Sequence, residues 1–240
     1  MSLFSHLFGG KPAMPAYTYD ELTINGRTLK LTFFAHASVA LEYKGRHIYI
    51  DPVIGNAEYD KLPKADMILV THSHYDHFDM AAIEALQTPD TRILLDKTSA
   101  EGFQGDCYTM LPGAKAEPFA DIKVEAVAAY NTSEAQLQFH PKEREDCGYV
   151  VVLDDAVRIY FSGDTEPTPE LRALQSIDIA FVCVNQPYTM KPEQAVEAIK
   201  ALRPQIYYPY HYGQVDEPTD VEALARMLEG VCDVRIRELA

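Results

Sequence analysis

The sequence lacks features that would place the chain in a membrane or on a secretion route. No apolar run approaches the roughly 18 residues that a membrane-spanning helix needs. The short apolar patch at the start, MSLFSHLF, has no basic stretch ahead of it and ends at Gly9 and Gly10, too soon for a signal peptide. We expect no membrane span, and we expect residues 1–20 to form a tail ahead of one domain over residues 21–240.

Cysteine and basic residues are also few. The four cysteines show no CxxC spacing, which favours reduced thiols and a cytoplasmic location. Lys and Arg total 21 against 36 Asp and Glu, and the net charge of −15 disfavours nucleic acid as a partner, because phosphate binding needs clustered cations. Gly-rich phosphate loops and GxSxG are absent, so we expect neither a nucleotide cofactor nor a nucleophile elbow.

Strand and helix signals alternate along the rest of the chain. Residues 97–121 give no clear signal, and Asp79 is a plausible N-cap for the first helix. We predict strands at 29–34, 37–43, 46–51, 67–71, 92–96, 122–130, 149–154, 158–162, 177–185, 205–210 and 233–237. We predict helices at 78–86, 169–174, 192–202 and 221–228.

A weak internal repeat indicates how these elements are arranged. VALEYKGRHIYI matches VVLDDAVRIYF, ADMILVTH matches IDIAFVCVN, and AAIEAL matches QAVEAI, at offsets of about 111 to 113 residues. Each half reads hairpin, buried strand, helix, buried strand, helix, with the last helix visible only in the second half. Two such halves bury most surface as an α/β fold with four layers, an α/β/β/α sandwich. Chance similarity between apolar strands is the alternative.

The stretch THSHYDHFD concentrates three histidines directly after the apolar strand MILV. Alternate residues of a strand share a face, so His72 and His74 can point to one place, and the following turn brings Asp76 and His77 round. Imidazole and carboxylate are the ligands that zinc and similar divalent ions accept. A polar loop that merely faces water would explain one histidine, but not three at this spacing.

HxHxDH after a buried strand resembles the signature of the metallo-β-lactamase fold superfamily, and the resemblance extends over about residues 29–237. The segments FFAHASVALEYKGRHIYIDP, SGDT, NQPYTM and YPYHYG resemble the branch that includes ascorbate-6-phosphate lactonase and N-acyl-phosphatidylethanolamine phospholipase D. This resemblance implies that Asp164 bridges two metals and that His211 is the last histidine ligand. Both residues also follow predicted strands, where an α/β fold gathers its sites.

One position departs from the family's pattern. Many members carry a third histidine for the first metal just after the strand that corresponds to 122–130, but this chain has Asn131 there, a poor zinc ligand. The next histidine is His140, in a long connection without clear periodicity, and such loops tend to carry function. Our hypothesis is that the loop folds back and His140 completes the first site. The alternative is an exposed His140 and a weak or empty first site.

Two further residues have roles implied by the resemblance. Asp51 resembles an aspartate that orients a metal ligand through its imidazole N–H, although it could simply close the turn before Pro52. His36 occupies the position of a histidine common in this branch and could face the substrate or donate a proton. Tyr130 and Tyr188 are weaker candidates of the same kind.

These observations predict a metal-dependent hydrolase. Two divalent cations, zinc in the first place with Mn²⁺ or Fe²⁺ as alternatives, would share Asp164 at a separation of about 3.5–4 Å. A metal-bound hydroxide, oriented by Asp76, would attack an ester-type bond of a small molecule, and His36 would protonate the leaving group. The resemblance to the lactonase branch implies a lactone as the first choice of substrate, with a phosphodiester next. A non-catalytic metal-binding protein with a degraded first site and a di-iron redox protein are the alternatives. The sequence leaves the oligomeric state open.

Overall fold

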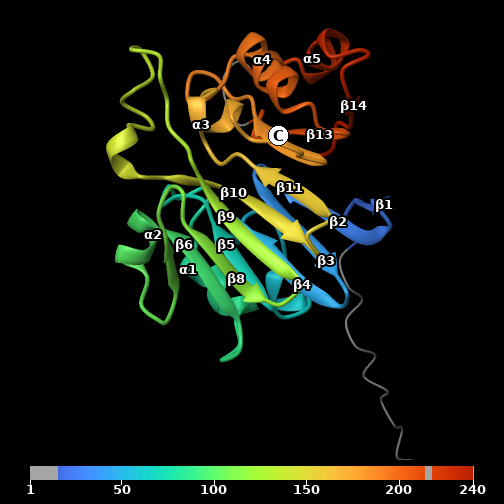
Figure 1. Cartoon of the computed structure of the whole chain (residues 1–240). Coiled ribbons are helices and arrows are strands. Elements are labelled where there is room, and N and C mark those ends of the chain that lie inside the picture. The colour runs from blue at the N-terminus through green and yellow to red at the C-terminus, as the bar shows by residue number, and fades with distance from the viewer. Residues whose placement is uncertain (1–15, 214–217, 240) are drawn as a thin grey trace, which may run out of the picture.

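The chain folds into two seven-stranded sheets that pack face to face with helices on their outer faces (Figure 1). This computed structural model describes residues 16–213 and 218–239. The strand orders are β1-β2-β3-β4-β5-β6-β7 and β14-β13-β12-β11-β10-β9-β8. In Figure 1, α1 lies below the first sheet and α2 at its left-hand end beside β6, and α3, α4 and α5 lie above the second sheet. The predicted four-layer α/β/β/α sandwich is therefore confirmed.

The first sheet is antiparallel from β1 to β4 and parallel from β4 to β7. Its inner strand β5, the run MILV, is buried at every residue, because helices cover one face and the second sheet covers the other. The strands are β1 Tyr19–Ile24, β2 Arg27–Ala35, β3 Ser38–Tyr43, β4 Arg46–Ile50, β5 Met67–Val70, β6 Arg92–Asp96 and β7 Tyr108–Met110.

The second sheet repeats this pattern, antiparallel from β8 to β11 and parallel from β11 to β14. The strands are β8 Lys115–Phe119, β9 Ile122–Ala128, β10 Cys147–Leu153, β11 Val157–Phe161, β12 Ile179–Cys183, β13 Ile206–Tyr210 and β14 Asp233–Val234. The two sheets therefore correspond strand by strand, which confirms that the weak repeat in the sequence is structural.

Helices cover the outer faces. Asp79 caps α1 as predicted, since its carboxylate accepts hydrogen bonds from the backbone N–H groups of Ala81 and Ala82. Ile83 and Leu86 of α1 pack with outward-facing residues of the first sheet in a separate apolar cluster. The helices are α1 Met80–Leu86, α2 Lys97–Gly102, α3 Pro169–Arg172, α4 Pro192–Leu202 and α5 Val221–Met227, with short 3₁₀ turns η1 Tyr59–Lys61 and η2 Lys142–Arg144. None of these helices is long and apolar enough to cross a membrane.

The main core lies between the sheets. Phe33 of the first sheet packs against Tyr208 of the second, with ring centroids 5.1 Å apart. The Tyr149 hydroxyl crosses from the second sheet to donate a 2.8 Å hydrogen bond to the carbonyl oxygen of Val70 in the first. This buried contact fixes the end of β5 directly before THSH. The relative position of the sheets therefore sets the position of the histidine cluster.

A carboxylate on the first strand joins the two sheets at their rim. Asp20 in β1 accepts a 2.5 Å hydrogen bond from the hydroxyl of Tyr208 in β13. The guanidinium of Arg237, near the C-terminus, donates to both oxygens of Asp20 at 2.7 and 2.8 Å. This arrangement ties the beginning of the domain to its end.

The structure differs from the sequence-based expectations mainly at the edges of the sheets. The short strands β1, β7 and β8 and the helix α2 were not predicted, and α2 is the missing last helix of the first repeat. The first described strand, β1, begins at Tyr19, two residues before residue 21, where we expected the domain to start. Residues 1–15 of the predicted tail lie outside the described residues.

Candidate metal centre

The predicted site residues meet where strands of both sheets end. THSHYDH follows β5, SGDT follows β11 and His211 follows β13, and parallel strands direct these ends to one edge. His36, Asp51 and His211 adopt left-handed backbone conformations, with φ of 55°, 44° and 51°. Such conformations are costly for residues other than glycine and concentrate at functional sites, where they turn a side chain sharply away from the strand.

Gly163 allows the second sheet to approach this edge closely. Its φ is +60°, and a Cβ there would lie 3.0 Å from the Cβ of Thr71 and 3.1 Å from the carbonyl oxygen of Cys147. A side chain would therefore push the turn away from the first sheet. The glycine of SGDT thus sets the position of Asp164 beside the histidines of the first sheet.

The first group of candidate ligands consists of His72, His74, His140 and Asp164. One ligand atom from each lies within 4.8 Å of the others, and all but His74 are buried. Nε2 of His72 is 3.1 Å from Nδ1 of His74. Nε2 of His140 is 3.3 Å from Oδ2 of Asp164. The structure therefore brings His140 back to the histidine cluster and does not leave it on the surface.

The second group consists of His36, Asp76, His77 and His211, again with ligand atoms within 4.8 Å of one another. Nε2 of His36 lies 3.2 Å from Oδ2 of Asp76, and its ring centroid is 3.8 Å from that of His211. His36, predicted to act as a proton donor, therefore lies among the candidate ligands themselves.

Asp164 lies between the two groups. Oδ1 of Asp164 is 3.4 Å from Nε2 of His77, and Oδ2 is 3.3 Å from Nε2 of His211. The same Oδ2 is 3.8 Å from Nε2 of His72 in the first group. This geometry suits a carboxylate that contacts two cations at once.

Hydrogen bonds on the far side of the imidazoles fix their orientation. His77 donates from Nδ1 to Oδ2 of Asp51 at 2.8 Å. The hydroxyl of Thr71 donates its single hydrogen to the same oxygen of Asp51 at 2.7 Å, so it can only accept from Nδ1 of His72, 3.0 Å away. The neutral forms of His72 and His77 therefore present the lone pair of Nε2 toward the centre. Hydrogen-bond partners of metal-ligating imidazoles, as Asp51 and Thr71 would be here, adjust the affinity of a site for its metal.

Other atoms at the centre are buried without a hydrogen-bond partner. Within the part of the chain that the structure describes, these include Nε2 of His77, Nε2 of His211 and Oδ1 of Asp164. Unpaired buried polar atoms are costly, and a cation at the centre would satisfy all three. The residues present therefore fit a pair of divalent metal ions.

The electrostatics of the site favour positive charge. Burial and the neighbouring cationic groups lower the pKa of His74 to about 4, so this imidazole is neutral, as a metal ligand must be. Burial opposes protonation of His211 and His140, but Asp164 with Asp76 raises the pKa of His211 to about 10. Asp146 and Asp164 raise that of His140 to about 9. The carboxylates of Asp76, Asp146 and Asp164 therefore stabilise positive charge at the centre, which either protons on the imidazoles or metal cations can supply.

The connection between β9 and β10, residues 129–146, is here named the His140 loop. Asn131, at the position where many family members have a histidine, lies at its beginning. The backbone N–H of Asn131 donates to the carbonyl oxygen of His140 at 2.8 Å. Its side-chain amide donates to the carbonyl oxygens of Gln136 and Tyr188, at 3.1 and 2.7 Å. Asn131 therefore does not face the centre and instead closes the loop that does.

Glu166 anchors the His140 loop from the second sheet. This fully buried carboxylate accepts hydrogen bonds from the backbone N–H and the hydroxyl of both Thr132 and Ser133, at 2.5 to 2.9 Å, and from the amide of Gln194 at 2.8 Å. Nothing in the sequence singled out Glu166, because its partners are distant along the chain. Its place directly after SGDT was the only available signal.

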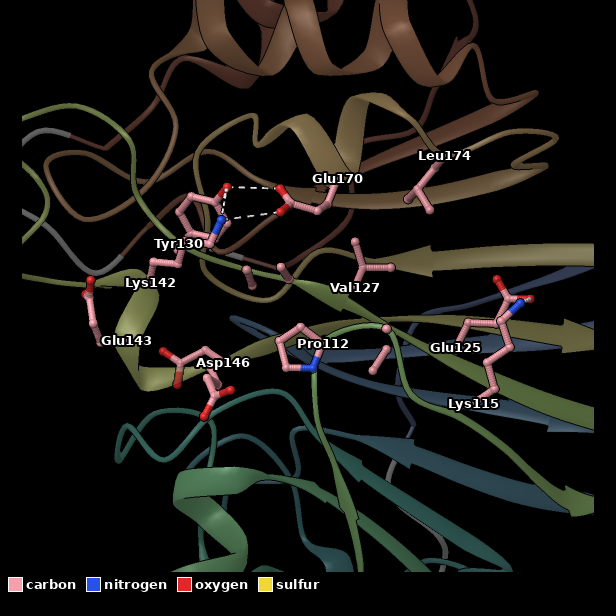
Figure 2. Close-up of a pocket in the computed structure, with 15 residues that line it drawn as sticks. Pro112, Lys115, Glu125, Val127, Tyr130, Lys142, Glu143, Asp146, Glu170 and Leu174 are labelled. Atoms are coloured by element: carbon pink, nitrogen blue, oxygen red, sulfur yellow. Dashed lines mark hydrogen bonds and ion pairs between the residues drawn. The ribbon is translucent and has the colours of Figure 1, made fainter.

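Residues near the two ends of the His140 loop line a cavity of about 720 Å³, here named the outer cavity (Figure 2). Hydrogen bonds beside this cavity hold both ends of the loop. The hydroxyl of Tyr130 donates to Glu170 of α3 at 2.9 Å, and Lys142 of η2 donates to that hydroxyl at 3.2 Å. Tyr130 therefore points away from the metal centre.

The site cavity is a separate hollow of about 410 Å³ directly over the candidate ligands. Tyr188, a weaker candidate in the sequence, lines it. Asn185, which the sequence did not single out, also lines it, and its amide nitrogen lies 2.9 Å from Nδ1 of His211. The lining residues are His36, His74, Tyr75, Asp76, Gln138, Phe139, His140, Asp164, Asn185, Tyr188 and His211.

Comparisons with known proteins agree with this geometry. Residues 30–211 match the family described as Beta-lactamase superfamily domain. A UPF0173 metal-dependent hydrolase of Koribacter versatilis is 30% identical over 223 residues, which cover 86% of this chain and 94% of that protein.

Solved structures give the same result. A protein of Parabacteroides distasonis assigned as a metal-dependent hydrolase is 40% identical, with a TM-score of 0.88, and the match covers 94% of this chain and 100% of the other. A metallo hydrolase of Ignicoccus hospitalis is 26% identical, with a TM-score of 0.72, over 88% of this chain and 95% of the other.

Proposed function

Since this chain belongs to the beta-lactamase superfamily and is a metal-dependent hydrolase of the metallo-β-lactamase fold, we propose a bond for it to cleave. We propose that it hydrolyses an ester-type bond of a small molecule. A lactone is the first choice and a phosphodiester the second. The proposed cofactor is a pair of divalent cations, zinc in the first place. His72, His74, His140 and Asp164 would hold one cation, and Asp76, His77, His211 and Asp164 the other.

The position of Asp164 supports this proposal most directly. Its two oxygens lie 3.3 to 3.8 Å from imidazole nitrogens of both groups. A single structural ion would need only one of these groups. His140 beside His72 and His74 also favours a complete first group, and so argues against a degraded first site.

The chain's own residues suit hydrolysis at this point. Two cations held by these residues would supply a water of lowered pKa and would stabilise negative charge that develops on the substrate's oxygen. Asp76 is partly accessible from the site cavity and orients the attacking water. His36, whose Nε2 lies 3.2 Å from Asp76, passes a proton to the leaving oxygen. The site cavity of about 410 Å³ is large enough for a small molecule.

Metal counting together with turnover tests this function. We expect elemental analysis to find two cations per chain, EDTA to abolish turnover of lactones, and zinc or manganese to restore it. Asp164→Asn should lose both cations and turnover, whereas Asp154→Asn, in the turn before β11, should retain them. Turnover that persists without metal would refute the proposal. Complete inertness with both cations bound would instead favour a metal-binding protein without catalysis.

A further inference from the structure

Aromatic side chains from three separate segments line the site cavity. Tyr75 comes from the loop after β5, Phe139 from the His140 loop, and Tyr188 from the loop after β12. Tyr75 and Tyr188 are 87% and 40% exposed, although large apolar side chains usually avoid such exposure. Three exposed or half-buried rings in the lining of one cavity indicate a surface that a ligand covers.

Two of these rings form a preformed wall. The centroids of Phe139 and Tyr188 are 5.0 Å apart, with the ring planes at 76°, an edge-to-face arrangement. Asn131 holds this pair in place, because its amide donates to the carbonyl oxygen of Tyr188 while its backbone N–H donates to that of His140. A ligand group that packs on this wall therefore meets rings that are already oriented, at little entropic cost.

The site cavity offers no side chain that would recognise an anion. Among the described residues that line it there is no lysine or arginine, and its ionic groups are the carboxylates and imidazoles of the metal centre. Arg144 does not line the cavity, and its guanidinium donates to Asp146 at 2.8 Å and to Ser73 at 3.2 Å. By contrast, Lys115 and Lys142 line the outer cavity (Figure 2).

On the basis of the proposed hydrolase function, we propose that the substrate is an uncharged carboxylic ester or lactone whose aromatic or apolar substituent packs against Phe139 and Tyr188. An anionic substituent such as a phosphate, packed against the aromatic wall and away from the cations, would be desolvated there without a lysine or arginine to pair with. In the reaction, the oxygen of water bonds to the carbonyl carbon, and the C–O ester bond breaks. The alcohol oxygen leaves with a proton, and the products are a carboxylic acid and an alcohol.

Matched lactones test this selectivity on the zinc-loaded protein. We expect kcat/KM for γ-phenyl-γ-butyrolactone to exceed that for γ-butyrolactone by about tenfold, since aromatic contacts add to the burial of the ring. A γ-hydroxymethyl lactone should likewise be preferred over its phosphate ester. Equal rates within the first pair, or preference for the phosphate ester, would overturn the substrate class while leaving the hydrolase function intact.

Substitutions locate the selectivity. Phe139→Ala and Tyr188→Ala should each reduce the ratio of kcat/KM between the phenyl and the plain lactone severalfold. Tyr108→Ala, which removes a ring that is 51% exposed on β7, is the matched control and should leave the ratio unchanged. An unchanged ratio in both site variants would place the preference elsewhere and refute the role of the wall.

A binding measurement separates this inference from the catalytic function. 2-Phenyltetrahydrofuran has the ring and the phenyl group but no carbonyl, so calorimetry can compare its binding with that of tetrahydrofuran even if no lactone is hydrolysed. We expect tighter binding of the phenyl compound to the wild-type protein and a loss of that difference in Tyr188→Ala. Inertness toward every lactone with this binding preference intact would refute the hydrolase function alone. Absence of the preference would refute the aromatic site.

Discussion

The backbone N–H of Asn131 donates a 2.8 Å hydrogen bond to the carbonyl oxygen of His140. At the position where the family resemblance implies a histidine ligand, this chain has an asparagine that fastens the loop carrying His140, the proposed replacement. His140 then lies 3.3 Å from Asp164 and joins His72 and His74. We therefore propose that His140, nine residues after Asn131, takes the place of the histidine that is absent after β9.

The first prediction concerns this replacement. His140→Ala should leave the second group intact and remove one cation, so elemental analysis should fall from two ions per chain to one. His47→Ala, which removes a half-buried histidine of β4 outside both groups, is the control and should retain two. Two tightly held ions in His140→Ala would remove this residue from the centre.

The second prediction concerns the anchor of the loop. Glu166→Gln replaces a carboxylate that accepts five hydrogen bonds, so donors from Thr132 and Ser133 lose partners. Hydrogen bonds to charged groups contribute about 1.5–3 kcal/mol each, and we expect a loss of about 2 kcal/mol in stability. Hydrogen exchange of residues 131–140 should accelerate. Glu134→Gln, an exposed acid of the same loop, should change neither quantity, and slow exchange in Glu166→Gln would contradict the anchoring role.

The third prediction concerns the support beneath His77. Asp51→Asn should leave all ligands in place yet weaken metal binding by about 10–100-fold, because Asp51 orients His77 directly and His72 through Thr71. Competition with a chromophoric chelator measures this affinity. Asp154→Asn serves as the control. Equal affinity in Asp51→Asn and the wild-type protein would show that Asp51 only closes the turn.

The fourth prediction concerns pH. Burial tends to raise the pKa of Asp20, but the hydrogen bonds from Tyr208 and Arg237 outweigh it and lower this pKa below its ordinary value. A lowered folded-state pKa stabilises the protein above the unfolded value of about 3.9, and this stabilisation is lost as the pH falls through the folded-state pKa.

Asp20→Asn should therefore destabilise the chain by about 1–3 kcal/mol at pH 7. The difference from the wild-type protein should shrink as the pH falls from 7 toward 2, as measured by urea unfolding. Asp60→Asn, at an exposed position, gives the baseline. A difference that does not vary with pH would mean that the carboxylate's charge does not carry the effect.

The fifth prediction concerns the coupling between metal and fold. The candidate ligands come from both sheets, so a bound cation joins the two halves of the domain. Free zinc at about 100 times its dissociation constant should add about 2.7 kcal/mol of stability, visible as a rise in Tm that EDTA reverses. Asp164→Asn should show a much smaller rise, and an equal rise would mean that zinc binds elsewhere.

The sequence was sufficient for the buried parts of this fold. MILV, RILLD and PEQAVEAIKAL were predicted within a residue of their observed bounds, because wholly apolar strands and regular helical spacing are strong signals. The edge strands β1, β7 and β8 were missed because most of their residues are exposed or half-buried, which leaves little hydrophobic pattern. Asp96, assigned to the end of a strand, also caps α2 and so concealed the start of that helix.

The sequence predicts the candidate site residues that are clustered in one motif or lie at strand ends. It does not reveal the residues whose partners are close only in the folded chain. His72, His74, Asp76 and His77 lie within six positions, and Asp164 and His211 sit at strand ends. Glu166 and Asn185 could not be found, because their function depends on side chains that are distant in the chain. His36 was found, but its place 3.8 Å from the ring of His211 depends on how the sheets meet.

Two corresponding loops, one in each half of the domain, contribute different side chains to the candidate site. The loop after β5 contributes His72, His74, Asp76 and His77, whereas the corresponding stretch after β12, residues 184–190, contains no histidine or carboxylate and contributes Tyr188 to the cavity wall. We therefore expect that substitutions at positions 186–189 can change which molecules are accepted while the candidate ligands after β5 remain in place. In related chains, selectivity can therefore diversify through this one loop, while the other loops of both halves keep the candidate ligands, including His140, Asp164 and His211 of the second half.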